Sequence, residues 1–439
     1  MGYLKSLATS FVWICTFLAI ITFIPGLPPN VDFTAHNLTL PKKIPKELLN
    51  ENLNKAEKLY QGKVRGPESF DSYDGILYFT TADGAVHKII GDELKEVVKF
   101  KETCKNKLEK DLCSHPLGLK FDKKGTLYVV DTNHGIYKVD VKKGSYEKVI
   151  DASQPIEGNL PKTPNSVDVA KNGDLYWTDM SSDYKLNDGI FSILSDPSGR
   201  LIHFDAKTKK NKVLLDNLGC ANGVKLSDDE SFVLVNELVM SRVIKYHLKG
   251  PKTGQSEIII EGLPGFPDNI HSDNHGNFLI SLVLIADEEN PHLIQSLLPH
   301  PNIRKMCVRF LSLLELPFKL FDKIYPNDYC KRIHYWVGSF QNSPMIVPMD
   351  AIVLRIDANG KILNAMATSN SQISSISSAF FLNDYMWLGS PFNDYLARVH
   401  IDEILPDLKN KVDKKPSQKS NTQQVKPNSK KESKVKVEL

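Results

Sequence analysis

Residues 74–89 read DGILYFTTADGAVHKI, which is a turn, a short strand with an aromatic centre, a second turn and a second strand. Alternating apolar residues between turns that contain Gly and Asp are typical of β-hairpins. The same pattern returns as KGTLYVVDTNHGIYKVD at residues 124–140 and as NDYMWLGSPFNDYLARVHID at residues 383–402. A repeat of this kind decides the fold, because each copy buries its apolar face against its neighbours.

The complete repeat has six copies, and the other three occupy residues 172–182 with 199–210, 229–248, and 275–287 with 351–362. The first five copies start 46 to 57 residues apart. A period near 50 built from short strands is typical of a β-propeller. We therefore predict an all-β, six-bladed β-propeller over residues 61–405, with an insertion at residues 288–345 in the fifth blade. A two-sheet sandwich is the alternative, but it does not explain six similar units.

The composition indicates a globular protein, since 41% of the 439 residues are hydrophobic and 24% are charged. Lys and Arg number 55 against 52 Asp and Glu, which excludes a uniformly basic protein that coats nucleic acid. The positive charge concentrates at the C-terminal end, where residues 406–439 are rich in Lys, Ser, Asn and Gln. Such a segment has too little apolar surface to fold, so we predict a disordered basic tail.

Residues 7–24, LATSFVWICTFLAIITFI, form an uninterrupted apolar run. A helix of this length spans about 27 Å, close to the thickness of the hydrocarbon layer. We predict a transmembrane signal anchor, preceded by a cytoplasmic tip at residues 1–6 and followed by a stalk at residues 25–60. A cleaved signal peptide is the alternative, but no clear small-x-small cleavage site follows the run.

Two features place the body outside the cytosol. Asn37 begins the glycosylation sequon Asn-Leu-Thr, and Cys104 and Cys113 enclose a short loop that favours a disulfide in an oxidising compartment. We therefore predict a single-pass type II protein of the plasma membrane or endoplasmic reticulum, with the propeller facing the exterior or lumen. Two free surface thiols are the alternative for the first cysteine pair. Whether Cys307 and Cys330 pair within the insertion is left open.

The insertion contains one helical pattern with the spacing i, i+3, i+4, i+7, i+8, i+11, formed by Ile303, Met306, Cys307, Phe310, Leu311 and Leu314. Basic residues outnumber acidic ones in the same stretch. One interpretation is a helical cap over the mouth of the propeller tunnel. The other is a basic, apolar helix that lies against the membrane surface.

Oxygen-bearing side chains stand where the chain enters four of the blades. Glu68 follows RGP, Asn165 follows TP, Asn222 follows CA, and Asp268 with Asn269 follows GFP. Inner strands of a propeller meet at its axis, so these side chains are expected to converge there. Carboxylate and amide oxygens suit a hard cation such as Ca²⁺, whereas zinc prefers His and Cys. Ordinary turn formation is the alternative for any one of them.

Three stretches carry a resemblance to a known family: LPGFPDNI at residues 263–270, NGV at 222–224, and PLGL at 116–119 after Cys104 and Cys113. Over roughly residues 1–405 the chain resembles the strictosidine synthase-like family of calcium-dependent six-bladed propellers, in its membrane-associated, hemomucin-like branch. The resemblance implies a Ca²⁺ ion in the tunnel. Its expected ligands are Glu68, Asn165, Asn222 and Asp268, with Asn269 as a further candidate.

The resemblance also implies a calcium-dependent esterase of arylesterase type that acts on a small-molecule ester or lactone. Asp268 is the favoured base, and His115 and His134 resemble a histidine pair of related enzymes. The approach to blade six reads SSISSAF at residues 374–380, without the acid that strictosidine synthases place there, which argues against that condensation. The absence of a Gly-x-Ser-x-Gly motif argues against a serine hydrolase. A non-catalytic cell-surface binding protein with a structural calcium site is the alternative.

Overall fold

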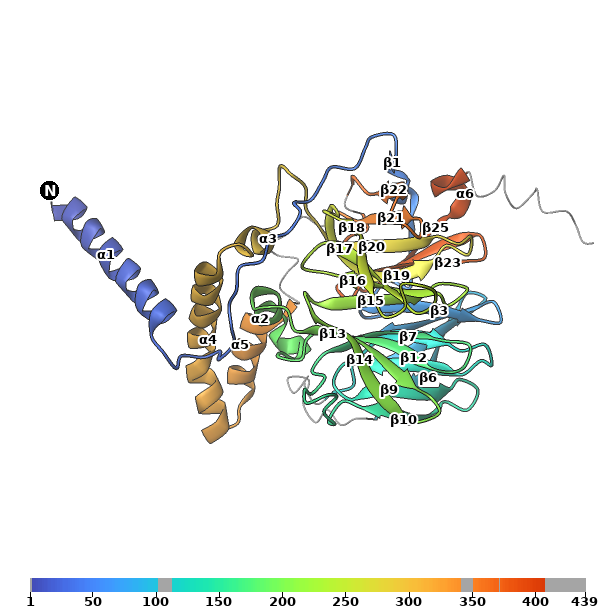
Figure 1. Cartoon of the computed structure of the whole chain (residues 1–439), viewed down its shortest axis with the longest axis horizontal. Helices are drawn as coiled ribbons and strands as arrows, with labels where there is room; N and C mark the ends of the chain where they lie inside the picture. The colour runs from blue at the N-terminus through green and yellow to red at the C-terminus, as the bar shows by residue number, and fades with distance from the viewer. Residues whose placement is uncertain (1, 102–112, 341–349, 371, 407–439) are drawn as a thin grey trace, which may run out of the picture.

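A computed structural model describes residues 2–101, 113–340, 350–370 and 372–406 (Figure 1). Its strands form six sheets, in which strands that follow one another along the chain pair antiparallel. The first three sheets contain β3 (Pro67–Tyr73), β4 (Ile76–Thr81), β5 (Ala85–Ile90) and β6 (Glu93–Lys99); β7 (Pro116–Phe121), β8 (Leu127–Asp131), β9 (Gly135–Asp140) and β10 (Ser145–Asp151); and β11 (Pro164–Val169), β12 (Leu175–Asp179), β13 (Gly199–Asp205) and β14 (Lys210–Leu218).

The other three sheets follow the same plan. They contain β15 (Ala221–Leu226), β16 (Phe232–Glu237), β17 (Arg242–His247) and β18 (Ser256–Glu261); β19 (Gly265–Ser272), β20 (Phe278–Ile285), β21 (Ile352–Ile356) and β22 (Ile362–Ala367); and β23 (Ser378–Leu382), β24 (Tyr385–Gly389) and β25 (Leu396–His400). Each predicted hairpin supplies the second and third strands of one sheet, so the repeat is confirmed as the unit of the fold.

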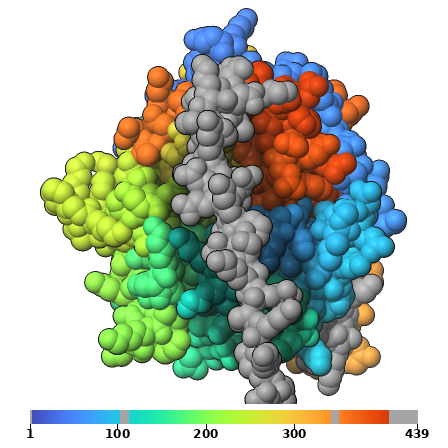
Figure 2. Space-filling model, turned by 90° about the vertical axis from the view of Figure 1, so that its right-hand side faces the viewer, coloured from blue at the N-terminus to red at the C-terminus, as the bar shows by residue number. Residues whose placement is uncertain are grey.

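The six sheets close into a ring. The first strands contact one another in the order β3, β7, β11, β15, β19, β23, and β23 contacts β3 again. Figure 2 shows the result on one face, where successive sectors of the chain follow one another around a centre. The predicted mostly β, propeller-like architecture is therefore confirmed, and residues at the starts of the first strands come together near the axis.

The N-terminal part of the chain helps to close the ring. β2 (Glu57–Leu59) pairs with β25, so it completes the sheet formed by the C-terminal strands. β1 (Leu49–Asn50) pairs parallel to β22 at the edge of the fifth sheet. Part of the segment that we expected to be a stalk, residues 25–60, therefore belongs to the folded body.

Apolar side chains fill the space between neighbouring sheets. Trp177 and Leu175 of β12 are fully buried and pack against Val130 of β8, Ile150 of β10 and Ile202 of β13. Burial of each such side chain stabilises the fold by about 1.5–3 kcal/mol. Comparable clusters lie between the other sheets, so the core is divided into layers around the ring.

The longer helices and two short ones lie on one side of the ring, whereas the short α6 (Ile401–Ile404) lies at the other side, beside β25 (Figure 1). α1 (Gly2–Phe23) contains the predicted anchor and is long and apolar enough over Tyr3–Phe23 to cross a membrane. The insertion between β20 and β21 forms α3 (Leu293–Leu297), α4 (Pro301–Ile324) and α5 (Asp328–Gly338), which confirms the helix expected there. The short α2 (Gly189–Leu194) lies between β12 and β13 and was not predicted, because its apolar run is too brief to show a period.

Several predictions fall outside the described residues or fail there. Cys104 and residues 407–439 are outside that part of the chain, so the bond from Cys104 to Cys113 and the disordered tail stay predictions. Cys307 and Cys330 are both free thiols, so the pairing that was left open is not formed. Asn37 is exposed, as a glycosylation acceptor must be.

Candidate functional site

A local irregularity positions the four predicted ligands. The pairing register shifts between Pro67 and Phe70 in β3, and it shifts at the equivalent places in β11, β15 and β19. A β-bulge of this kind leaves one or two residues unpaired and redirects their side chains. Glu68, Asn165, Asn222 and Asp268 all lie within these bulges. The sequence promotes the bulges, because Pro67, Pro164 and Pro267 supply no N–H to the ladder.

The bulges bring these side chains to one cavity of about 450 Å³. Glu68, Asn165, Asn222 and Asp268 all line it, together with His115. The fifth candidate, Asn269, does not line the cavity; its Nδ2 donates to Glu68 Oε1 over 3.3 Å, so it supports a site residue instead. The remaining walls are mostly apolar and come from α2, the segment before it, β20 and the insertion helices: Leu186, Ile190, Ile193, Leu194, Val283, Leu284, Leu293, Ile294, Leu297, Cys307, Phe310 and Leu311.

Donors from the second strands hold the first strands of the next sheets in place. Thr178 Oγ1 of β12 donates to the carbonyl of Asn222 over 2.6 Å, and Asn236 Nδ2 of β16 donates to the carbonyl of Asp268 over 2.6 Å. Thr80 Oγ1 of β4 makes the same contact with the carbonyl of Leu117. Sequence reasoning missed these residues, although a Thr or Asn near the end of the second strand recurs in three of the six sheets.

Burial dominates the electrostatics of the two carboxyl groups. Glu68 and Asp268 are each 6% exposed. Burial raises the pKa of Glu68 to about 7, against hydrogen bonds from Asn269 and Ser377 that lower it. Burial raises the pKa of Asp268 well above its usual range, and the charge of Glu68 adds to this effect. Within the described residues neither carboxylate forms an ion pair, so both lack a compensating positive charge.

Two oxygens at this site also lack donors. Asn222 Oδ1 and Asp268 Oδ1 are buried and accept no hydrogen bond from any residue that the structure describes. Buried polar atoms are normally satisfied, and an orphaned oxygen indicates a partner such as an ion. Two carboxylates and two amides, with unsatisfied oxygens between them, fit the oxygen-rich coordination that Ca²⁺ requires. The residues present therefore fit the cation that the sequence predicts.

A second layer of the same tunnel shows the contrast. Further along the inner strands, Lys120 Nζ lies 2.9 Å from Asp71 Oδ1, and Lys225 Nζ lies 2.6 Å from Asp168 Oδ2. Burial opposes ionisation of Asp168, but Lys225 and Lys120 hold its pKa below the usual range. In this layer acidic and basic side chains alternate from strand to strand. Lysines thus neutralise the carboxylates of one layer, whereas Glu68 and Asp268 in the other layer have no basic partner among the described residues.

The two predicted histidines are separated in the structure. His115 lines the cavity, and its backbone N–H donates to Asp131 Oδ2 over 3.1 Å. His134 does not line the cavity; its Nε2 is buried without a hydrogen-bond partner. Burial raises the pKa of Asp131 to about 6, and the neighbouring His134 opposes that effect. Of these two histidines, His115 alone lines the cavity.

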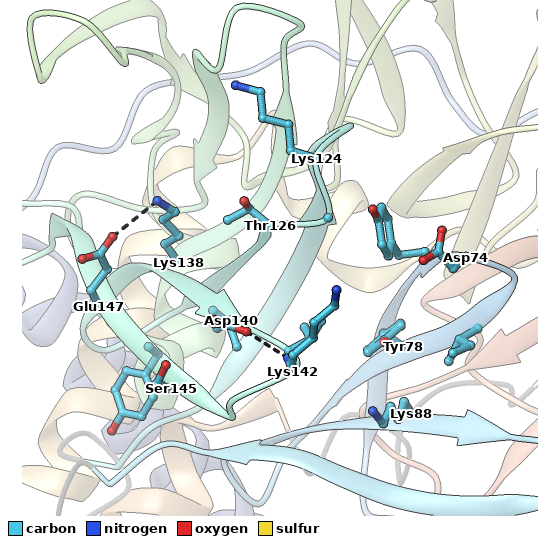
Figure 3. Close-up of a pocket in the computed structure, with 16 residues that line it drawn as sticks. Asp74, Tyr78, Lys88, Lys124, Thr126, Lys138, Asp140, Lys142, Ser145 and Glu147 are labelled. Carbon is cyan, nitrogen blue, oxygen red and sulfur yellow. Dashed lines mark hydrogen bonds and ion pairs between the residues drawn. The ribbon is translucent and has the colours of Figure 1, made fainter. Parts of the chain in front are cut away.

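Two other places among the described residues are less suitable. Asp188, Glu315 and His334 lie within 4.8 Å of one another, but Lys319 Nζ already lies 2.6 Å from Glu315 Oε2, so this cluster is internally compensated. A hollow of about 860 Å³ lies at the other end of the inner strands, between the first two sheets (Figure 3). Of its lysines, Lys124 and Lys142 are exposed, and Lys138 pairs with Glu147 over 3.5 Å.

Comparisons with known proteins agree with this geometry. Residues 165–251 match the strictosidine synthase family, and residues 49–89 match the N-terminal region of strictosidine synthase-like proteins. The adipocyte plasma membrane-associated protein Hemomucin of Drosophila melanogaster is 36% identical over 407 residues, which cover 91% of this chain and 70% of the relative. The chain belongs to the adipocyte plasma membrane-associated protein and hemomucin family.

Vertebrate members of the family are more distant. The Bos taurus adipocyte plasma membrane-associated protein is 30% identical over 356 residues, covering 80% of each chain. Among solved structures, a gluconolactonase from Xanthomonas campestris superposes with a TM-score of 0.50 at 12% identity, covering 86% of this chain and 99% of that one. At that identity the likeness shows the fold alone, and it agrees with the propeller-like ring of sheets.

Proposed function

We propose that this protein is a membrane-anchored, calcium-dependent ester hydrolase of arylesterase type, in which each of the six sheets is one blade of the propeller. Glu68, Asn165, Asn222 and Asp268 form the polar floor of a cavity whose other walls are mostly apolar. The observation that supports the proposal most strongly is that two of these side chains, Glu68 and Asp268, are buried carboxylates without a compensating charge among the described residues. Apolar pockets with a few convergent polar groups are the usual form of small-molecule sites. A bound ester would meet these groups at the bottom of the cavity.

Glu68, Asn165, Asn222 and Asp268 would hold the Ca²⁺ ion. When bound, the ion would polarise the ester carbonyl and stabilise negative charge on its oxygen. Asp268 is the base: its carboxylate lies in the cavity, and a carboxylate there can take a proton from an attacking water. His115 lies at the same cavity and is a second candidate for proton transfer. The apolar walls exclude bulk water and orient the ester with its carbonyl toward the floor.

The topology of the proposal follows from α1. This helix anchors the protein in the membrane, and the propeller lies on the exterior or luminal side of the plasma membrane or endoplasmic reticulum. The names of the relatives refer to the plasma membrane, and the exposed sequon at Asn37 is consistent with that side. Cys104 and Cys113 are proposed to be bonded in that compartment.

The test uses the full-length protein in lipid nanodiscs. Turnover of phenyl acetate is measured with Ca²⁺, with a chelator, and with Asp268→Asn, and calcium binding is measured separately by calorimetry. We expect turnover that requires both Ca²⁺ and Asp268. If calcium binds but no ester is turned over, the site is structural, and the protein is a cell-surface binding protein that uses its loops for partners. If calcium does not bind, the proposed site itself is wrong.

A further inference from the structure

α4 buries several charged side chains and exposes several large apolar ones, which is the reverse of what is usual for a helix of a soluble protein. The residues that it buries include Arg304 at 0%, Arg309 at 6% and Glu315 at 0% exposure, with Val308 as the only apolar one among the buried set. Charged residues are almost never fully buried in soluble proteins unless they are paired. Two of these charges are paired: Arg304 Nη2 lies 3.0 Å from Asp196 Oδ1, and Lys319 Nζ lies 2.6 Å from Glu315 Oε2. The buried side of α4 therefore carries three charged residues beside its apolar contacts.

The outer face of α4 is apolar instead. Ile303, Phe310, Leu314 and Phe321 are 40% to 55% exposed. Their spacings of 7, 4 and 7 residues place them on one stripe of a helix with about 100° per residue. Beyond this stripe the exposed apolar and aromatic surface continues through Ile324, Tyr325, Tyr329 and Trp336. A contiguous apolar surface of this kind is a mark of an interaction site for a protein or a membrane.

Contacts between α4 and α1 indicate that this exposed apolar surface faces the membrane. Arg309 Nη1 donates over 2.8–3.0 Å to the carbonyls of Ile21 and Thr22 in the last turn of α1 and of Ile24 directly after it. A cation at a helix C-terminus is favourable, so this contact fixes α4 to the end of the anchor. In Figure 1 α1 leaves the body at α4 and points away from the sheets. If α1 spans the bilayer, α4 therefore lies at the level where the chain leaves it.

The exposed side chains of the insertion suit a position at the membrane–water interface. Tyr325, Tyr329 and Trp336 are 65% to 72% exposed, and such amphipathic rings concentrate at membrane–water interfaces. Lys323 and Arg332 are also exposed on the same helices, where they suit anionic headgroups. A helix that lies in the plane of a membrane interface combines these three features: an apolar stripe, exposed aromatic rings and basic side chains.

The cavity opens on this same surface. Leu293 of α3 and Phe310 of α4 line the cavity and are also 68% and 40% exposed, so they form part of its rim. Behind them most of the walls are apolar, and the two carboxylates of the cavity, Glu68 and Asp268, come from the first strands. A ligand that fits this order has an apolar chain at the rim and a polar ester group at the inner end.

We infer that the outer faces of α4 and α5 lie in the surface of the bilayer that α1 spans, and that the cavity receives from it an ester with a long apolar chain. The second part rests on the proposed hydrolase function; the first part does not. Entry from the bilayer needs no passage of the apolar chain through water, because Leu293 and Phe310 connect the membrane surface with the cavity.

The first experiment tests the membrane surface without any activity. Full-length Trp13→Phe protein is placed in nanodiscs of dibrominated phosphatidylcholine, which quenches tryptophan near its acyl chains. We expect quenching that falls by about half or more when Trp336→Phe is added, because the other two tryptophans, Trp177 and Trp387, are buried in the sheets. Quenching that is unchanged by Trp336→Phe overturns the membrane placement of the cap.

The second experiment tests the ligand class. Turnover of the long-chain p-nitrophenyl palmitate in nanodiscs is compared with that of soluble phenyl acetate for Phe321→Asp/Ile324→Asp. Both residues are exposed and distant from the cavity floor, and Ile258→Asp on β18 is the matched exposed control. We expect the double variant to lower palmitate turnover by about tenfold or more while phenyl acetate turnover stays unchanged. Equal effects on both esters overturn entry from the bilayer. Absence of turnover in the unmodified protein instead overturns the proposed hydrolase, and the quenching result then stands by itself.

Discussion

Replacement of Glu68 by Gln should change stability in opposite directions with and without calcium. Without the ion, the folded protein must keep a buried carboxylate whose pKa is raised from 4.5 to about 7 by burial. Above pH 7 this ionised group costs on the order of 3 kcal/mol of stability relative to the unfolded chain. Gln has the same shape and no charge. At pH 8 in a chelator, Glu68→Gln should therefore raise the free energy of unfolding by on the order of 3 kcal/mol.

The sign of the pH dependence follows from the same shift. A carboxyl whose pKa is raised by folding contributes stability below its unfolded pKa, and that contribution is lost as the pH rises through its folded pKa. The difference between Glu68→Gln and the unmodified protein should thus shrink toward pH 5. With Ca²⁺ at about 1,000 times its dissociation constant, the unmodified protein should gain about 4 kcal/mol. The variant lacks a charged ligand, so it should gain much less and become the less stable of the two.

The assay is denaturant unfolding of the full-length protein in detergent, with a chelator and with Ca²⁺, at pH 5 and pH 8. Glu237→Gln is the matched control, because Glu237 is 1% exposed but already pairs with Arg242. That control should lose stability in every condition by the same amount. The reasoning is refuted if Glu68→Gln behaves like Glu237→Gln, or if Ca²⁺ stabilises both proteins equally.

Further predictions concern the chemistry, the tunnel and the topology. Asp268→Asn should lower phenyl acetate turnover by about 100-fold or more, measured in initial rates, while the circular dichroism spectrum stays unchanged. The thermal shift produced by Ca²⁺ should shrink from pH 8 to pH 5, since Glu68 binds a proton near pH 7 without the ion. Asp168→Asn leaves Lys225 without its partner and should lower the free energy of unfolding by about 3 kcal/mol, equally with and without Ca²⁺. Asn37→Gln should remove the mobility shift that glycosidase treatment produces in the protein from secretory cells.

The repeat could be predicted from sequence because it is local. Each hairpin carries its own alternation and turns, so residues 74–89 predict β4 and β5 without reference to the rest of the chain. The convergence of the polar side chains on the cavity floor could be predicted from the sequence for a related reason. Glu68 and Asp268 occupy equivalent places at the starts of first strands, and a ring of strands brings equivalent places together.

Contacts between segments far apart in the sequence could not be predicted in this way. His134 has the same local setting as many loop residues, and only the packing of β8 shows that it lies away from the cavity. The pairing of β2 with β25 joins residues far apart in sequence, so residues 57–59 carry no local sign that they complete a sheet. The alternation of Asp71, Lys120, Asp168 and Lys225 is visible only once the inner strands are placed side by side.

The orientation of α4 shows the limit of periodicity most clearly. A stripe of apolar residues predicts a helix with one apolar face, but it does not say whether that face meets a core or a membrane. Here the stripe that includes Ile303 and Phe321 faces outward. Arg304 is held inside by the carbonyl of Ser195, and Arg309 by the carbonyl of Ile21. The decision between the two interpretations of the insertion therefore lies in the partners of its arginines and not in its apolar pattern.

The polar floor and the apolar roof of the cavity come from different parts of the chain, so we expect them to control different properties. The floor comes from the starts of first strands, which every sheet of the ring possesses, so the proposed cation site depends on the repeat itself. The apolar roof comes from α2 in the third sheet and from α3 and α4, which the fifth sheet alone contributes through its insertion. Changes in the insertion can therefore alter the ligand and the approach to the membrane while the ion-binding floor stays intact. A variant of Phe310 should accordingly change selectivity between esters more than it changes calcium affinity, and equal changes in both would show that roof and floor act as one unit.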